Sequence, residues 1–142
     1  MFANFFKSKP ENKQDTIQEA IDALNQLTKH FQEYEQNNNN SNITIELAPA
    51  WYKCVLLGGD TAGIQGTLVM KSSLQRYGVL EDHPLKKTLK EIGFRVGANS
   101  SSHSKNSVEL KETFFLYDAK LISQVPERCQ RAMNESQNKL VN

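Results

Sequence analysis

Long apolar runs are missing from this sequence of 142 residues. No run approaches the ~18 apolar residues that a membrane-spanning helix needs, so we expect no membrane span. The apolar start, Phe2 to Phe6, is shorter than the roughly 7–15-residue apolar core of a secretory signal, and no small-residue cleavage site follows it. These absences predict a cytoplasmic protein.

Cysteine and histidine are scarce as well. Cys54 and Cys129 fall in a strand pattern and a helix pattern, which favours two small buried side chains over a disulfide. His30, His83 and His103 show no metal-ligand spacing with each other or with the cysteines. No nucleophile elbow and no Cys–His arrangement for nucleophilic catalysis is present. The sequence therefore predicts no metal, no cofactor and no catalytic residue.

The composition that remains is ordinary for one globular domain, with 38% hydrophobic and 23% charged residues. The net charge of +1 is unevenly spread along the chain. Residues 11–60 carry three lysines against eight acidic residues (net −5), and residues 61–111 carry eight basic against four acidic residues (net +4). This polarity indicates either a surface that faces a partner or complementary charges within one copy or between two copies.

The first helix is predicted to begin at Asp15 and to end before the asparagine-rich run 37–42. Asp15 can cap the helix and Gln18 stands three residues later, as in a capping box. A stripe at spacings of three and four would face the core: Ile17, Ala20, Ile21, Leu24, Leu27, Phe31 and Tyr34.

Residues 1–14 are predicted to form a flexible apolar and basic arm, because Pro10 disfavours an earlier start of the helix. Phe2, Phe5 and Phe6 in this arm need a surface on which to bury. That surface is either the rest of the same domain or a partner.

Five strands are predicted, over residues 43–47, 51–57, 64–70, 94–96 and 108–117. Pro49 should end the first, and the glycine-rich stretch 58–63 should be a hairpin turn, since no Gly-Lys-Ser/Thr ending of a phosphate loop follows it. Residues 99–107 should form a mobile polar loop. In the last strand, one face turns aromatic at Phe115 and Tyr117, which either a helix or a partner must cover.

Two further helices complete the chain. The central helix 83–92 should be capped by Asp82 or His83 and stopped by Gly93. Its buried stripe would be Leu85, Leu89 and Ile92, with Lys86, Lys87 and Lys90 pointing outward. The last helix should start after Asp118, and Pro126 should kink or break it near Val125.

The predicted order α-β-β-β-α-β-β-α indicates an α+β protein with a five-stranded antiparallel sheet and helices on one face. Residues 15–142 would form a single domain. This element order resembles that of the small dimeric chaperones of bacterial type III secretion, and its first five elements resemble those of a double-stranded-RNA-binding domain. The first resemblance implies a protein-binding dimer, and the second implies RNA binding.

Our leading hypothesis is a non-enzymatic protein-binding module, an adaptor or small secretion-chaperone-like protein, whose partner is another protein or a second copy of the chain. Three features support this hypothesis: the absence of catalytic motifs, the uneven distribution of charge along the chain, and the exposed aromatic residues. The residues expected to bind the partner are Phe2, Phe5, Phe6, Phe115 and Tyr117.

Two alternatives stay open. The first is nucleic-acid binding, in which phosphates contact a basic cluster on the central helix and beyond it. That cluster comprises Lys86, Lys87, Lys90 and Arg95, with Lys105 as a further cation. The second alternative is a small enzyme whose site would lie around Asp60, Thr61 and His83.

Overall fold

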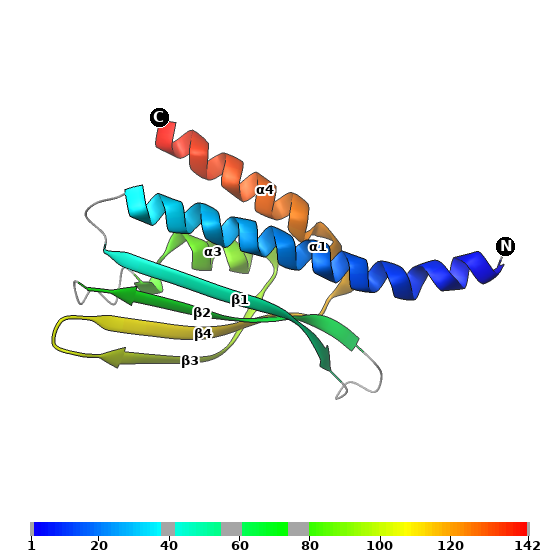
Figure 1. Ribbon diagram of the computed structural model, residues 1–142, viewed down its shortest axis with the longest axis horizontal. Helices are drawn as coiled ribbons and strands as arrows, with labels where there is room; N and C mark the ends of the chain where they lie inside the picture. Colours follow the sequence, from blue (N-terminus) through cyan, green and yellow to red (C-terminus); the bar gives the residue numbers. More distant parts are fainter. Residues whose placement is uncertain (1, 38–41, 55–60, 74–79, 142) are drawn as a thin grey trace.

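The computed structural model describes the backbone of residues 2–37, 42–54, 61–73 and 80–141, and the side chains of residues 15–37, 42–52, 62–73 and 80–136. Three helices and one four-stranded antiparallel sheet lie within these ranges (Figure 1). In chain order they are α1 (Phe2–Asn37), β1 (Ile43–Cys54), β2 (Thr61–Ser72), α3 (Pro84–Ile92), β3 (Arg95–His103), β4 (Val108–Leu116) and α4 (Ala119–Val141).

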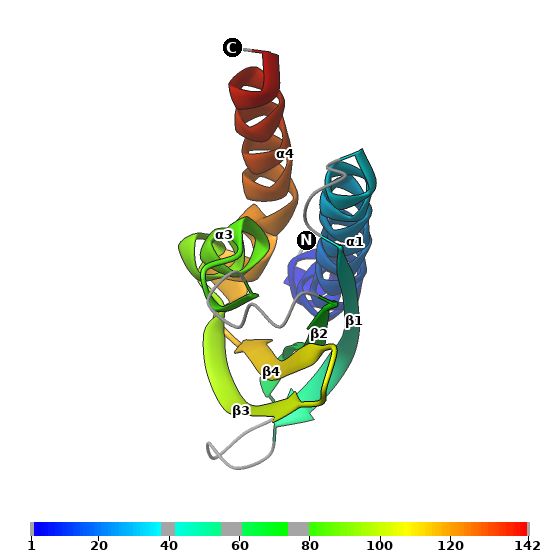
Figure 2. The ribbon, with the colours of Figure 1, turned by 90° about the vertical axis from the view of Figure 1, so that its left-hand side faces the viewer.

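The helices and the sheet form two layers. The strand order across the sheet is β1-β2-β4-β3, and α1, α3 and α4 all lie on one face of it (Figure 2). The other face is covered by no described element, and we call it the open face. The predicted α+β class and antiparallel pairing are confirmed, while the prediction of five strands is wrong. The observed order α-β-β-α-β-β-α therefore does not match the predicted order on which both resemblances depended.

Pro49 explains the first error in the strand count. It was predicted to end a strand, but β1 runs through it from Ile43 to Cys54, and Pro49 stands opposite Gly66 of β2. β1 is an edge strand, and a proline without an N–H is tolerated where one side of the strand has no partner. The predicted strands 43–47 and 51–57 are thus one strand as far as residue 54, and residues 55–60 lie outside the described part of the chain.

The second error concerns residues 99–107, which were predicted to be a loop. Residues 99–103 belong to β3 and pair with β4 as far as His103 opposite Val108. Only a short turn remains, in which the amide N–H of Ser104 donates to the carbonyl oxygen of Ser107 at 2.9 Å. The residues from Asn99 to His103 are exposed, so backbone hydrogen bonds to β4 hold this edge strand. The segment therefore has no hydrophobic alternation from which a strand could be predicted.

The core lies between the helices and the inner face of the sheet. The α1 stripe is confirmed, since its members from Ile17 to Phe31 are at most 9% exposed, although Tyr34 is only half-buried. Among the residues that line the opposite wall on β2 and β4 are Ile64, Leu68, Met70, Leu110 and Phe114.

Helix α4 begins as predicted and continues further than predicted. Asp118 Oδ1 accepts the amide N–H groups of Lys120 at 2.9 Å and Leu121 at 3.2 Å, which caps the helix. The helix then runs without a break through Pro126, because Val125 and Cys129 on either side are fully buried in the core. Burial also raises the pKa of the Cys129 thiol to about 12, so this side chain stays a protonated hydrophobe at neutral pH.

Helix α1 also runs through a proline. It begins at Phe2 instead of Asp15, so the backbone of residues 2–14 continues the helix where a flexible arm was predicted. Pro10 removes only one backbone hydrogen bond of the ladder. The first part of α1 projects past the sheet and past the other helices (Figure 1).

Candidate functional site

Helix α3 is fixed to α1 by a buried histidine. His83 is the N-cap of α3, and its Nδ1 accepts the amide N–H of Leu85 at 3.0 Å. Its Nε2 lies 2.8 Å from Oε1 of Glu35 on α1, and both side chains are buried. Since Nδ1 is an acceptor, the ring proton is on Nε2, and this N–H donates a hydrogen bond to the carboxylate. Both ring nitrogens are thereby engaged in holding the fold.

This geometry bears on the small-enzyme alternative. His83 is 2% exposed, so it is not presented to a substrate from solvent. Asp60 lies outside the described residues, and so does the side chain of Thr61. In the described part of the chain, no group of three or more His, Cys, Asp or Glu side chains could hold a metal ion.

A second buried polar pair fixes α3 to the sheet. Lys86 was predicted to point outward, but it is 4% exposed and its Nζ lies 2.8 Å from Oε1 of Glu112. Glu112 stands on the inner face of β4 between Leu110 and Phe114. A single carboxylate in an otherwise apolar face needs a buried cation, and this was the sequence signal that could have revealed the role of Lys86.

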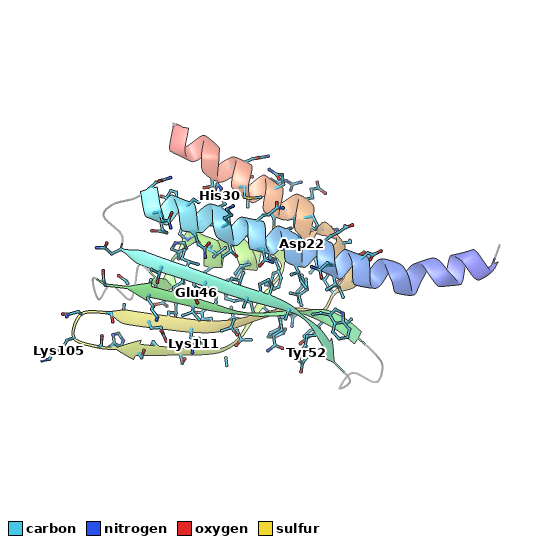
Figure 3. The ribbon with its side chains drawn as sticks, viewed as in Figure 1. Asp22, His30, Glu46, Tyr52, Lys105 and Lys111 are labelled. Atoms are coloured by element: carbon cyan, nitrogen blue, oxygen red, sulfur yellow. The ribbon has the colours of Figure 1, made fainter. Side chains whose placement is uncertain are left out.

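The residues predicted to contact phosphate are therefore not brought together. Lys86 is buried, whereas Lys87 and Lys90 are exposed on α3 on the helical side of the molecule. Arg95 is exposed on β3 and stands opposite Phe115 in the sheet register. Lys105 lies in the turn at the far end of the sheet (Figure 3). These cations do not form one basic patch.

An aromatic cluster occupies one end of the open face. It consists of Tyr52 on β1, Phe115 on β4 and Tyr117 directly after β4. The ring centroids of Tyr52 and Tyr117 are 5.9 Å apart, and those of Phe115 and Tyr117 are 5.7 Å apart. Two of the predicted partner-binding residues, Phe115 and Tyr117, thus lie together on the face that no described helix covers.

Glycines make room for these rings. Gly63 stands opposite Tyr52 in the register of β1 and β2, and a side chain there would overlap the Tyr117 ring. Gly97 lies beside the Phe115 ring, since an added Cβ atom would stand 3.3 Å from Phe115 Cε1. The rings therefore lean over bare backbone on β2 and β3, where glycine lets them approach the sheet closely.

Trp51 and Tyr52 are the large hydrophobic side chains that stay exposed among the described residues, at 48% and 43%. They are neighbours on an edge strand, so they point to opposite faces of the sheet. Tyr52 lies at the end of the molecule from which α1 projects (Figure 3). The sequence offered Trp51, Tyr52 and Phe115 as possible stacking groups, but Trp51 and Tyr52 were not among the predicted partner-binding residues. Only the strand register shows that Tyr52 lies beside Tyr117.

Phe2, Phe5 and Phe6 were the other predicted partner-binding residues. They belong to the projecting part of α1, and their side chains lie outside the described part of the chain. This part of the helix projects past the end of the sheet (Figure 1).

A groove of about 300 Å³ lies among the three helices, away from the open face. Phe31 and Tyr34 of α1 form one wall, and Ala132 of α4 lies across from them. Its further lining residues are Pro84, Lys87, Thr88, Glu91, Glu135 and Ser136.

No helix in the described residues is long and apolar enough to span a membrane. Comparisons with known protein families, with curated proteins and with solved structures find no match to this chain.

Proposed function

We propose that the protein is a non-enzymatic protein-binding module with an adaptor or chaperone-like role, acting in the cytoplasm. The aromatic cluster on the open face, with Tyr52 exposed at its edge, is the observation that carries this proposal. Tyrosine and tryptophan are enriched at protein interfaces, where they bury a large area with few rotatable bonds. The partner is another protein that covers this end of the sheet.

The electrostatics around the cluster support a protein partner over a nucleic acid. Arg95 is the cation that stands next to Phe115 in the register, and Gln65 stands opposite Phe115 on β2. Affinity for nucleic acid grows with the number of phosphates that cations neutralise. One arginine beside three aromatic rings supplies too little positive charge to bind nucleic acid in this way. An arginine among aromatic side chains is instead typical of a protein interface.

The cluster can also be removed without damage to the core. The core lies on the other face of the sheet, between the inner residues of β2 and β4 and the helices. Tyr52 is about half exposed, so its truncation should cost little stability. Loss of binding in such a variant would therefore report on the surface and not on folding.

The test is a pull-down from an extract of the source cell with a Tyr52→Ser variant. We expect the unaltered protein to retain a specific partner and the variant to lose it, with an unchanged unfolding midpoint for both. A matched control is Thr44→Ala, Glu46→Ala, which changes two exposed residues of β1 on the same face as Tyr52 but at the polar end.

Nuclease treatment of the extract should leave the partner bound. If the Tyr52→Ser variant and the control retain the same proteins, the open face is not the binding surface. If nuclease releases the captured material, nucleic-acid binding replaces the proposed function.

A further inference from the structure

The two edges of the sheet differ in how their backbone is covered. At the β1 edge, Nε2 of Gln32 on α1 donates to the carbonyl oxygen of Ile45 at 2.7 Å. Pro49 lies an even number of positions after Ile45, so its backbone also faces the free edge, where a proline has no N–H to offer. Covering an edge from a helix and placing a proline in it both keep a further strand from joining the sheet.

The β3 edge is built differently. β3 is the last strand in the order β1-β2-β4-β3, and no described element lies beyond it (Figure 2). Residues 96–104 contain no proline, lysine, arginine, aspartate or glutamate, and most of them are as small as Gly97 and Ala98 or are serines. On the adjacent strand β4, the charges of Lys111 and Glu109 offset each other. Another backbone can therefore approach this edge closely.

The hydrogen-bond pattern shows which backbone groups face this edge. The amide N–H of Ser104 donates to the carbonyl oxygen of Ser107 at 2.9 Å, where the hairpin of β3 and β4 turns. Residues of an antiparallel pair alternate between bonding to the other strand and facing away from it. Ser100 lies an even number of positions before Ser104 and bonds to β4, whereas Asn99 and Ser101 direct their N–H and C=O groups outward.

Cations stand at both ends of this uncharged edge. Arg95 is exposed at the start of β3, and Lys105 is exposed in the turn that follows it (Figure 3). In any twofold antiparallel pair of β3 strands centred on residues 99–101, Arg95 of each copy would lie opposite or diagonally across from Lys105 of the other. This repulsion would occur twice, so the edge is poorly suited to a second copy. The same two cations suit an added strand with an acidic residue near each end.

We propose that the β3 edge binds an extended, proline-free segment of the partner protein, which joins the sheet as an additional strand and carries an acidic residue near each end. Main-chain hydrogen bonds along residues 99–103, the regular part of the edge beyond the register shift, would hold this segment. Phe115 stands opposite Arg95 in the register, so the segment would run to the margin of the aromatic cluster. The inference rests on the proposed function and names the way in which the partner is bound.

Amide hydrogen exchange of the full chain, alone and with the partner purified from an extract of the source cell, tests this strand addition. In the chain alone, the amides of Asn99 and Ser101 should exchange quickly, and that of Ser100 slowly because it bonds to β4. The partner should slow exchange at Asn99 and Ser101 by roughly tenfold or more and leave Ser100 nearly unchanged.

Two outcomes of this measurement separate the strand addition from the proposed function. A complex that forms without slower exchange at Asn99 and Ser101 would overturn the strand addition and leave the proposed function intact. If the unaltered chain captures no partner, the proposed function fails and the strand addition fails with it.

A proline variant tests the same edge by binding. Ser101→Pro removes the outward N–H but no hydrogen bond to β4, and proline is tolerated at such an edge position. It should weaken binding of the partner roughly tenfold, because an acceptor of the added strand loses its donor. The matched control Ser101→Ala keeps the N–H and should bind like the unaltered chain. Urea unfolding shows whether each variant is folded, and the exchange measurement on the unaltered chain does not depend on them.

The acidic ends of the segment are tested at Lys105, which lies at the far end of the sheet from Tyr52 (Figure 3). Lys105→Glu and higher salt should both weaken the complex. Lys87→Glu, the same change of charge on α3, should not. Equal binding by the Lys105→Glu and Lys87→Glu variants would contradict the acidic ends. A partner that is lost on Tyr52→Ser but kept by Ser101→Pro would overturn the strand addition, and so would an oligomer of the chain that Ser101→Pro dissociates.

Discussion

Lys86 and Glu112 show at the scale of single residues how surroundings decide the role of a side chain. Lys86 follows Leu85 on α3, and its Nζ reaches a carboxylate on the inner face of β4. A buried ion pair adds little net stability over a well-packed apolar pair, but removal of one partner leaves an uncompensated charge. Glu112 Oε2 already has no hydrogen-bond partner among the described residues, which makes this carboxylate especially dependent on Lys86.

We predict that Lys86→Ala lowers the free energy of unfolding by about 3–5 kcal/mol, because Glu112 is then buried without a cation. The double variant Lys86→Met, Glu112→Leu should regain most of the loss, since both charges are gone. Urea unfolding measures both values. Lys87→Ala is the control, as this exposed neighbour should change stability by less than about 0.5 kcal/mol. A Lys86→Ala variant as stable as the control would show that the pair is not buried in solution.

At the scale of elements, the sequence predicted best the features that local residue spacing or a single cap residue determines. The α1 stripe, the stop at Gly93 and the start at Asp118 were all predicted correctly, because each depends on local spacing or on one cap. Gly93 has a φ of 126°, and its backbone N–H donates to the carbonyl oxygens of Leu89 and Lys90 in the last turn of α3, as a glycine stop requires.

The elements that sequence reasoning missed depend on position in the sheet. Pro49 is compatible with a strand only because β1 lies at an edge, and no local pattern reveals which strand is the edge. β3 has an exposed polar sequence from Asn99 onward, and its pairing with β4 supplies the hydrogen bonds that hold it. The aromatic cluster was predicted only at Phe115 and Tyr117, because the contribution of Tyr52 follows from register across β2.

Gly63 tests whether this register is correct. We predict that Gly63→Ala costs about 1–3 kcal/mol, as overpacking does, because the added Cβ atom would overlap both the Tyr117 ring and the backbone carbonyl oxygen of Leu116. Gly97→Ala should cost less, because its added Cβ atom would meet Phe115 at 3.3 Å, a distance that a small shift of the ring relieves. Near-ultraviolet circular dichroism and urea unfolding measure both effects. Equal losses in the two variants would mean that Gly63 is not packed this closely against Leu116 and Tyr117.

The whole molecule has two layers with separate roles in this account. The helical layer buries the core and ends in the projecting part of α1. The sheet layer leaves one face open, and the aromatic cluster lies at one end of it. The buried pairs that hold α3 to α1 and β4 keep the two layers together, so the partner surface can be changed without loss of the fold.

A photo-crosslinking experiment tests the central claim, that the aromatic end of the open face binds another protein. The photoreactive residue p-benzoylphenylalanine would replace Tyr52 in one protein and Thr44, on the same face of β1 at the polar end, in another. After irradiation in an extract of the source cell, we predict a discrete crosslinked partner from position 52 and none from position 44. The same crosslinked products from both positions, or none from position 52, would contradict the claim.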